Sequence, residues 1–86
     1  MNRIAFVNNK FVNFKNAKIH IEDRGLQFAD SVYEVIPIID SSIIDLNFHL
    51  KKLKFSLSEL SIIFKINKKN LIKIFSTLLK KNSIRY

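Results

Sequence analysis

The chain has 86 residues, no cysteine and a formal net charge of +8 at pH 7. A chain of this length forms at most one small domain, and it buries only about 60–65% of the surface that its unfolded form exposes. Disulfides and cysteine-ligated zinc are excluded, and His20 and His49 are too few for a histidine metal cage. No run approaches the ~20 apolar residues of a membrane span, so we expect a cytoplasmic protein without a metal or a membrane partner.

The positive charge is concentrated in the second half of the chain. Residues 1–50 carry five basic and six acidic side chains, whereas residues 51–86 carry ten basic and one acidic. Only three of the fifteen basic residues are arginine, the preferred reader of phosphates and bases. AT-rich codons also account for much of the lysine, so we expect no specific nucleic-acid partner.

Two short apolar runs near the N-terminus predict a β-hairpin. Residues 4–7 and 11–14 flank Asn8-Asn9-Lys10, and asparagine tolerates the left-handed conformation that a tight turn needs. Further along, Lys18-Ile19-His20-Ile21-Glu22 alternates polar and apolar residues, which predicts a third strand. We expect His20 to lie exposed on this strand without a chemical role.

The segment Asp23-Arg24-Gly25 predicts a tight turn. It holds the only glycine of the chain, and glycine adopts a positive φ without a Cβ clash. We expect Asp23 and Arg24 to fix this turn. A short amphipathic segment, residues 26–30, follows it.

The run Val32-Tyr33-Glu34-Val35-Ile36 predicts a β-strand because β-branched and aromatic residues dominate it. Alternation along a strand places Tyr33 and Val35 on one face and Glu34 on the opposite face. We expect Glu34 to be a structural partner of Arg24 or of a lysine, and not an acid–base group.

A second hairpin is predicted from residues 32–39 and Ile43-Ile44, which flank the turn-forming Asp40-Ser41-Ser42. Pro37 interrupts the first arm of this hairpin. Because proline cannot donate to a strand ladder, it predicts a sheet edge, a bulge or a position whose N–H faces away.

From residue 46 the apolar period changes to that of a helix. Five leucines at intervals of 4, 3, 4 and 3 predict a helix over residues 46–60, with Asp45 as its N-cap. A second helix is predicted over residues 68–82, with Asn67 as its N-cap. Residues 82–86 predict a loop and the first step of another strand, which favours a partial domain.

Four segments in their order and spacing resemble the class IV pyridoxal-phosphate aminotransferases, which include D-amino-acid and branched-chain aminotransferases. They are residues 6–12, 17–19 and 49–53, and the central Asp23-Arg24-Gly25-Leu26-Gln27-Phe28-Ala29-Asp30-Ser31-Val32-Tyr33-Glu34-Val35. The resemblance implies an α+β fold, in which an antiparallel sheet carries two helices on one face. It also implies that residues 1–86 are a partial N-terminal small domain of a fold-type IV enzyme.

In this family pyridoxal 5'-phosphate is joined to a lysine on a strand of a second, larger domain. None of the twelve lysines matches that lysine, so the resemblance implies no catalytic residue in this chain and leaves open whether it is an enzyme. The ancestral activity that it implies is transamination between an amino acid, in particular a D-amino acid, and a 2-oxo acid. The present chain is expected to be inactive by itself.

The resemblance gives three residues of this chain a role in binding. Tyr33 matches the tyrosine that lines the substrate side of the family's site, and Val35, on the same face of the strand, is expected to help wall the pocket. Lys52 occupies the position of an arginine that holds the cofactor phosphate, and lysine keeps that charge without the bidentate fork. Each residue also has a purely structural alternative. Tyr33 can simply pack its aromatic ring, and Lys52 can belong to a solvated basic face of its helix. His49 matches a family histidine, to which we give a structural role.

Three hypotheses for the function stay open on the sequence. The first is a truncated or split class IV aminotransferase, which works as a homodimer or with a missing C-terminal part. The second is a small interaction module that docks a separately encoded remainder. The third is a nonspecific, basic nucleic-acid-binding domain.

Overall fold

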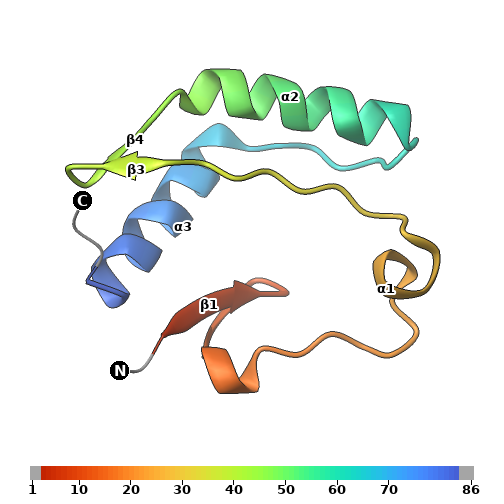
Figure 1. Ribbon diagram of the computed structural model, residues 1–86, viewed down its shortest axis with the longest axis horizontal. Helices are drawn as coiled ribbons and strands as arrows, with labels where there is room; N and C mark the ends of the chain where they lie inside the picture. Colours follow the sequence, from red (N-terminus) through yellow and green to blue (C-terminus); the bar gives the residue numbers. More distant parts are fainter. Residues whose placement is uncertain (1–2, 84–86) are drawn as a thin grey trace.

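The computed structural model of the protein describes residues 3–83 and shows an open α+β arrangement (Figure 1). The α+β class is confirmed, but the strands form two separate antiparallel pairs and not one sheet in this part of the chain. The elements in chain order are β1 (Ile4–Val7), β2 (Lys10–Asn13), a 3-10 turn η1 (Phe14–Asn16), α1 (Arg24–Phe28), β3 (Ile38–Ile39), β4 (Ser42–Ile43), α2 (Leu46–Glu59) and α3 (Lys68–Lys81).

The N-terminal hairpin is confirmed. Strands β1 and β2 pair antiparallel, and Val7 lies opposite Lys10 at the turn. The turn residues Asn8 and Asn9 both adopt positive φ, 49° and 66°, as a two-residue turn between right-twisted strands requires. Asparagine therefore supplies the positive φ that glycine more often supplies in such turns.

The predicted third strand, residues 18–22, is wrong. These residues have no strand partner, and their backbone closes a local turn in which Asp23 N donates to His20 O at 3.0 Å. His20 Nδ1 also accepts from Glu22 N at 3.0 Å. Alternation of polar and apolar residues describes a strand only where a neighbouring strand lies within reach, and none does here.

The segment around Gly25 forms the short helix α1, and the prediction of a positive φ at Gly25 is wrong. Asp23 is the N-cap, and its side chain accepts from Gly25 N at 2.8 Å. The left-handed residue is Ala29, the C-cap of α1, with a φ of 57°. Glycine still suits position 25, because a Cβ there would lie 2.9 Å from Asp23 Oδ1 and 3.0 Å from Ser31 Cβ, and both neighbours would have to shift.

An extended segment, residues 31–37, crosses the middle of the molecule from α1 to β3 (Figure 1). The predicted strand over residues 32–36 is wrong, because these residues make no backbone–backbone hydrogen bond in the described part of the chain and so pair with no neighbouring strand. Their side chains still alternate between half-buried and exposed, as predicted. The second hairpin is confirmed at its turn, where Asp40 and Ser41 have φ of 51° and 62°. Pro37 precedes β3, and its carbonyl accepts from Ile44 N at 3.0 Å.

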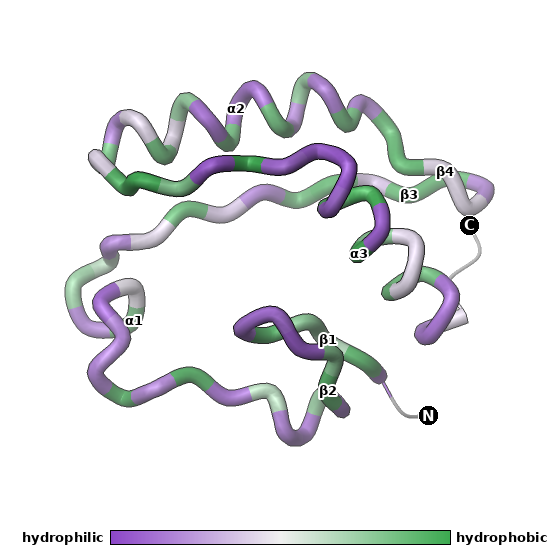
Figure 2. Tube along the Cα trace, turned by 180° about the vertical axis from the view of Figure 1, so that it is seen from behind, coloured by the Kyte–Doolittle hydropathy of each residue, from purple (hydrophilic) through white to green (hydrophobic). Residues whose placement is uncertain are grey.

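Both predicted helices are confirmed, and polar and apolar residues alternate around each of them (Figure 2). Asn67 caps α3 as predicted, because its side chain accepts from Asn70 N at 3.0 Å. The predicted side-chain cap at Asp45 is wrong. Asp45 is left-handed, with a φ of 54°, and its side chain accepts no cap hydrogen bond.

The core of the molecule is small and lies under α2. Leu50 and Leu57 are the buried apolar side chains, and they come from the predicted leucine face of α2. Helix α3 packs against β1, and Asn82 joins the end of α3 to the backbone of Ile4. The strand predicted at the C-terminal end involves residues 84–86, which lie outside the described residues.

Candidate functional site

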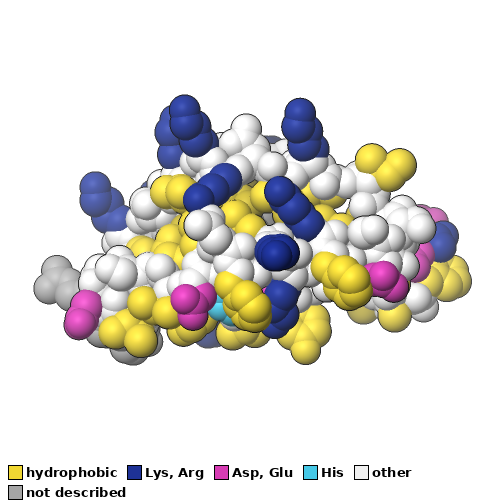
Figure 3. Space-filling model, turned by 90° about the horizontal axis from the view of Figure 1, so that it is seen from above, with side chains coloured by type: hydrophobic (Ala, Val, Ile, Leu, Met, Phe, Trp, Pro, Cys, Tyr) yellow, Lys and Arg dark blue, Asp and Glu magenta, His cyan; other side chains and the backbone are white. Residues whose placement is uncertain are grey.

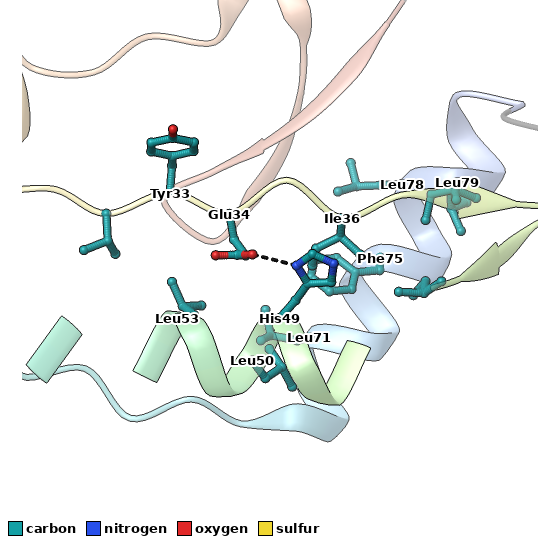
Figure 4. Close-up of a pocket in the computed structure, with 13 residues that line it drawn as sticks. Tyr33, Glu34, Ile36, His49, Leu50, Leu53, Leu71, Phe75, Leu78 and Leu79 are labelled. Carbon is teal, nitrogen blue, oxygen red and sulfur yellow. Dashed lines mark hydrogen bonds and ion pairs between the residues drawn. The ribbon is translucent and has the colours of Figure 1, made fainter. Parts of the chain in front are cut away.

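The extended segment, α2 and α3 enclose an apolar cavity of about 460 Å³ (Figure 4). Leu50 and Leu53 of α2, together with Phe75 of α3, supply part of its wall. The polar side chains at the cavity are few. They are Tyr33, Glu34 and His49.

Glu34 and His49 form the central polar contact of this cavity. Alternation along the extended segment turns Glu34 inward, and His49 lies on the first turns of α2, so the two side chains face each other (Figure 4). His49 Nδ1 and Glu34 Oε1 are 2.6 Å apart, and each side chain is only 12% exposed. A carboxylate in so sheltered a place needs partners, and His49 is the first of them.

Lys52 is the second partner of the Glu34 carboxylate. Its Nζ lies 3.4 Å from Glu34 Oε1, and its side chain is 54% exposed. The hydrogen bond from His49 lowers the pKa of Glu34 most strongly, burial opposes this effect, and the charge of Lys52 lowers the pKa further. Glu34 is therefore held as a carboxylate.

The predicted pairing of Glu34 with a lysine is confirmed, whereas its alternative partner, Arg24, lies elsewhere. Arg24 pairs with Asp30, with an Nη2–Oδ2 distance of 2.6 Å. The contact between Glu34 and His49 was not predicted. The signal for it was present, because alternation turns Glu34 inward and His49 lies beside the leucine face of its helix.

The three predicted binding residues do not lie together. Tyr33 reaches the cavity wall but is 85% exposed, and it points away from α2, opposite to Glu34 (Figure 4). Val35 is 74% exposed and does not line the cavity. Lys52 lies on the other side of the extended segment, with Glu34.

The described residues alone do not fit pyridoxal phosphate. A phosphate dianion needs several donors, and the predicted site offers one amine, that of Lys52, which is already paired with a carboxylate. The same amine lies 5.6 Å from the ring centroid of Phe48, a contact that also holds it on α2. A complete cofactor site therefore needs groups from outside residues 3–83.

Residues 3–83 contain neither a cluster of metal ligands nor a membrane-spanning helix. No group of three histidine, cysteine, aspartate or glutamate side chains lies close enough together there to hold a metal ion. None of the helices in this range has the length and the apolar character needed to cross a membrane.

Comparison with known proteins supports the resemblance drawn from the motifs. The chain is 33% identical over 80 residues to the D-alanine aminotransferases of Listeria monocytogenes and Staphylococcus epidermidis. It is 32% identical over 80 residues to a protein of Methanocaldococcus jannaschii assigned as a branched-chain-amino-acid aminotransferase. No protein-family model matches the chain.

These alignments cover nearly all of this chain but a minor part of each relative. Each spans 93% of the chain and 28% of the relative. The resemblance to the class IV aminotransferases is confirmed over this length, and the chain spans about 28% of the length of the curated relatives that it matches.

Proposed function

We propose that this chain, similar to aminotransferases along 93% of its length, supplies one wall of a class IV aminotransferase site and is inactive without the rest of it. The observation that carries the proposal is the similarity to D-alanine aminotransferases, together with the central motif at residues 23–35. The reaction that we propose for the completed site is transamination between D-alanine, or a related D-amino acid, and a 2-oxo acid. We place it in the cytoplasm, with pyridoxal phosphate as cofactor.

In this proposal the exposed side chains of the extended segment face the substrate. Tyr33 can donate its hydroxyl to a substrate carboxylate, and Val35 on the same face adds an apolar wall. Both are exposed, which suits residues that another part of a site covers.

Lys52 is proposed to contact the cofactor phosphate as one of several donors. Its side chain is 54% exposed, so it can approach an anion without unfolding α2. The cluster formed by Glu34, His49 and Lys52 holds the extended segment on α2, and in this way it fixes Tyr33 relative to Lys52. Lysine gives a weaker phosphate contact than arginine because it lacks the planar fork.

The first test is an activity measurement on the purified 86-residue chain. With D-alanine, 2-oxoglutarate and pyridoxal phosphate, we expect no pyruvate above the background without protein, because no lysine of the chain occupies the required position. Surface lysines will react weakly and at many places. A stoichiometric, borohydride-trapped product on one lysine, together with turnover, contradicts the proposal.

The positive arm of the test is a chimera. The 80-residue segment of the Listeria monocytogenes enzyme that aligns with this chain is replaced by residues of this chain. We expect the chimera to bind pyridoxal phosphate and to transaminate D-alanine, and we expect Tyr33→Phe to raise KM for D-alanine several-fold.

A matched pair of lysine variants tests the phosphate contact in the chimera. Lys52→Gln is expected to raise the dissociation constant of pyridoxal phosphate about tenfold, since it removes one charge-assisted hydrogen bond. The neighbouring Lys51→Gln removes the same charge from the same helix and is expected to change it less than twofold. Equal effects of the two variants would show that Lys52 has no specific role. A folded chimera that binds the cofactor but transaminates neither D-alanine nor another D-amino acid contradicts the proposed reaction.

A further inference from the structure

The β1–β2 hairpin and α3 pack together into a part of the molecule that contains no acidic residue. Neither residues 3–21 nor residues 60–83 include aspartate or glutamate. Asn82 joins the two elements, accepting from Ile4 N at 2.7 Å and donating to Ile4 O at 3.0 Å. Basic side chains are found on both elements. They are Arg3, Lys10, Lys15, Lys68, Lys69, Lys73, Lys80 and Lys81.

A groove of about 420 Å³ runs along the contact between the hairpin and α3. Two aromatic rings form its hairpin side, with Phe6 and Phe11 edge-to-face at a centroid distance of 4.8 Å. The remaining side chains that line it are polar or apolar but never acidic. They are Asn9, Asn70, Lys73, Ile74 and Thr77.

Cations lie beside aromatic rings of this hairpin and of the adjoining turn η1. Lys81 Nζ is 5.9 Å from the centroid of the Phe11 ring, and Arg3 Cζ is 3.8 Å from the centroid of the Phe14 ring. Phe11 is 38% exposed and Phe14 is 53% exposed, so parts of both rings remain accessible. An accessible ring next to cations offers a stacking surface and a phosphate contact at the same place.

We propose that this groove binds single-stranded nucleic acid without sequence preference. Phe11 stacks on a base, Lys73 and Lys81 contact the neighbouring phosphates, and the amides of Asn9 and Asn70 bond to whichever base edge is present. A double helix keeps its bases stacked on one another, and it therefore offers no free base to Phe11. This proposal does not depend on the proposed aminotransferase reaction, because none of its residues belongs to that site.

The test is fluorescence anisotropy with a labelled 20-nucleotide oligo-dT and the full 86-residue chain. We expect weak binding that strengthens at low salt, with log Kd varying linearly with log salt concentration. The corresponding 20-base-pair dT·dA duplex is expected to bind at least fivefold more weakly at the same salt concentration. Equal affinity for the duplex would reduce the interaction to charge attraction and would overturn the proposal, as would a lack of binding at 20 mM salt.

Two groove variants separate stacking from charge. Phe11→Leu keeps an apolar side chain but removes the stacking ring, and it is expected to weaken oligo-dT binding about tenfold with an unchanged salt dependence. Lys73→Gln is expected to lower the slope of the salt dependence by about 0.7, the value for one phosphate contact on a single strand.

The matched controls lie on α2, away from the hairpin (Figure 1). Phe55→Leu alters a phenylalanine that is 66% exposed, and Lys51→Gln removes one exposed charge. Both are expected to change the affinity less than twofold. If the controls weaken binding as much as the groove variants, binding is spread over the basic surface and the groove has no special role. Circular dichroism of each variant, compared with the unaltered chain, verifies that the fold is retained.

Discussion

Glu34 links the extended segment to α2 through two side chains of that helix. His49 Nδ1 lies 2.6 Å and Lys52 Nζ 3.4 Å from the same oxygen, Glu34 Oε1. The extended segment has no ladder hydrogen bonds over residues 32–36 in the described part of the chain, so this side-chain cluster is what fixes its position along α2. We therefore expect the stability of this region to depend on the charge of Glu34.

Acid pH is expected to weaken the link between the extended segment and α2. The fold lowers the pKa of Glu34 from its ordinary value of 4.5, mainly through the hydrogen bond from His49. A carboxyl group with a lowered pKa stabilises the folded state above its unfolded-state pKa, and this contribution is lost as the pH falls through the folded-state value. Thermal melting of the unaltered chain is therefore expected to shift to lower temperature below about pH 4.5, and Glu34→Gln is expected to flatten this shift.

The control for this prediction is Glu59→Gln. Glu59 is exposed at the end of α2, and the described residues supply no ion pair for it. The variant is expected to keep the acid dependence of the unaltered chain. An acid dependence of Glu34→Gln as steep as that of the unaltered chain would show that the Glu34 cluster does not stabilise the fold.

For single residues, the sequence predicted the direction of a side chain better than the residue that the side chain contacts. Alternation along residues 32–36 correctly placed Glu34 on the face opposite to Tyr33, because an extended backbone fixes side-chain direction locally, but it did not say which face points inward. The choice of His49 as partner depends on how α2 lies against the segment, which is a tertiary contact 15 residues away. Gly25 was correctly singled out as a special position of the backbone, but the reason was not a positive φ. Its close packing against Asp23 and Ser31 accounts for the glycine.

The secondary-structure elements differ in how their ends are held. Asn67 caps α3 with its side chain, whereas Asp45 has a left-handed backbone and its side chain makes no cap hydrogen bond to α2. At the other end of α3, the side chain of Asn82 makes three hydrogen bonds. Its amide group accepts from Ile4 N and donates to the carbonyls of Ile4 and Leu78.

Asn82 in effect replaces a neighbouring strand at the outer edge of β1. Its 2.7 Å and 3.0 Å contacts satisfy both backbone groups of Ile4, and both are partly buried. We predict that Asn82→Ala lowers the free energy of unfolding by about 1–3 kcal/mol, the usual effect of leaving buried groups without partners. Urea unfolding followed by circular dichroism measures this change.

Two further variants sharpen the test of Asn82. Asn82→Asp keeps the oxygen that accepts from Ile4 N but loses both donated bonds and adds a negative charge at the helix C-terminus, so we expect it to be no more stable than Asn82→Ala. Asn70→Ala is the control on the same helix, because its exposed side chain makes no hydrogen bond among the described residues. If Asn70→Ala lowers the free energy of unfolding as much as Asn82→Ala does, Asn82 has no special role in stability.

The elements themselves were predictable where local chemistry determines them. Asparagine pairs and serine or aspartate turns placed both hairpins, and leucine spacing placed α2, since each signal lies within a few residues. The prediction of a third strand at residues 18–22 was wrong because a strand needs a neighbouring strand, and the local sequence does not show whether one is present. The contact of Asn82 with Ile4 spans 78 residues and had no local signal.

On the scale of the whole molecule, the surface is too large for a self-contained protein of this mass. The accessible surface is 7462 Å², whereas a folded monomer of 10.1 kDa is expected to expose roughly 5,300 Å². The radius of gyration of 14.1 Å also exceeds the value of about 12 Å for a compact chain of 86 residues. Much of the additional surface is apolar, and hydrophobic side chains lie exposed between the lysines (Figure 3).

This open surface predicts how the chain behaves when it is expressed alone. The extended segment leaves backbone groups of residues 32–36 available for pairing with another chain, and exposed apolar side chains next to it, such as Tyr33 and Val35, favour association. We expect sedimentation velocity to show concentration-dependent oligomers or aggregates, and thermal melting to be broad. Hydrogen exchange is expected to be slowest in α2, which holds the buried Leu50 and Leu57. A compact monomer that melts in a single cooperative transition at high temperature would contradict this prediction, because it would require a core larger than these two leucines provide.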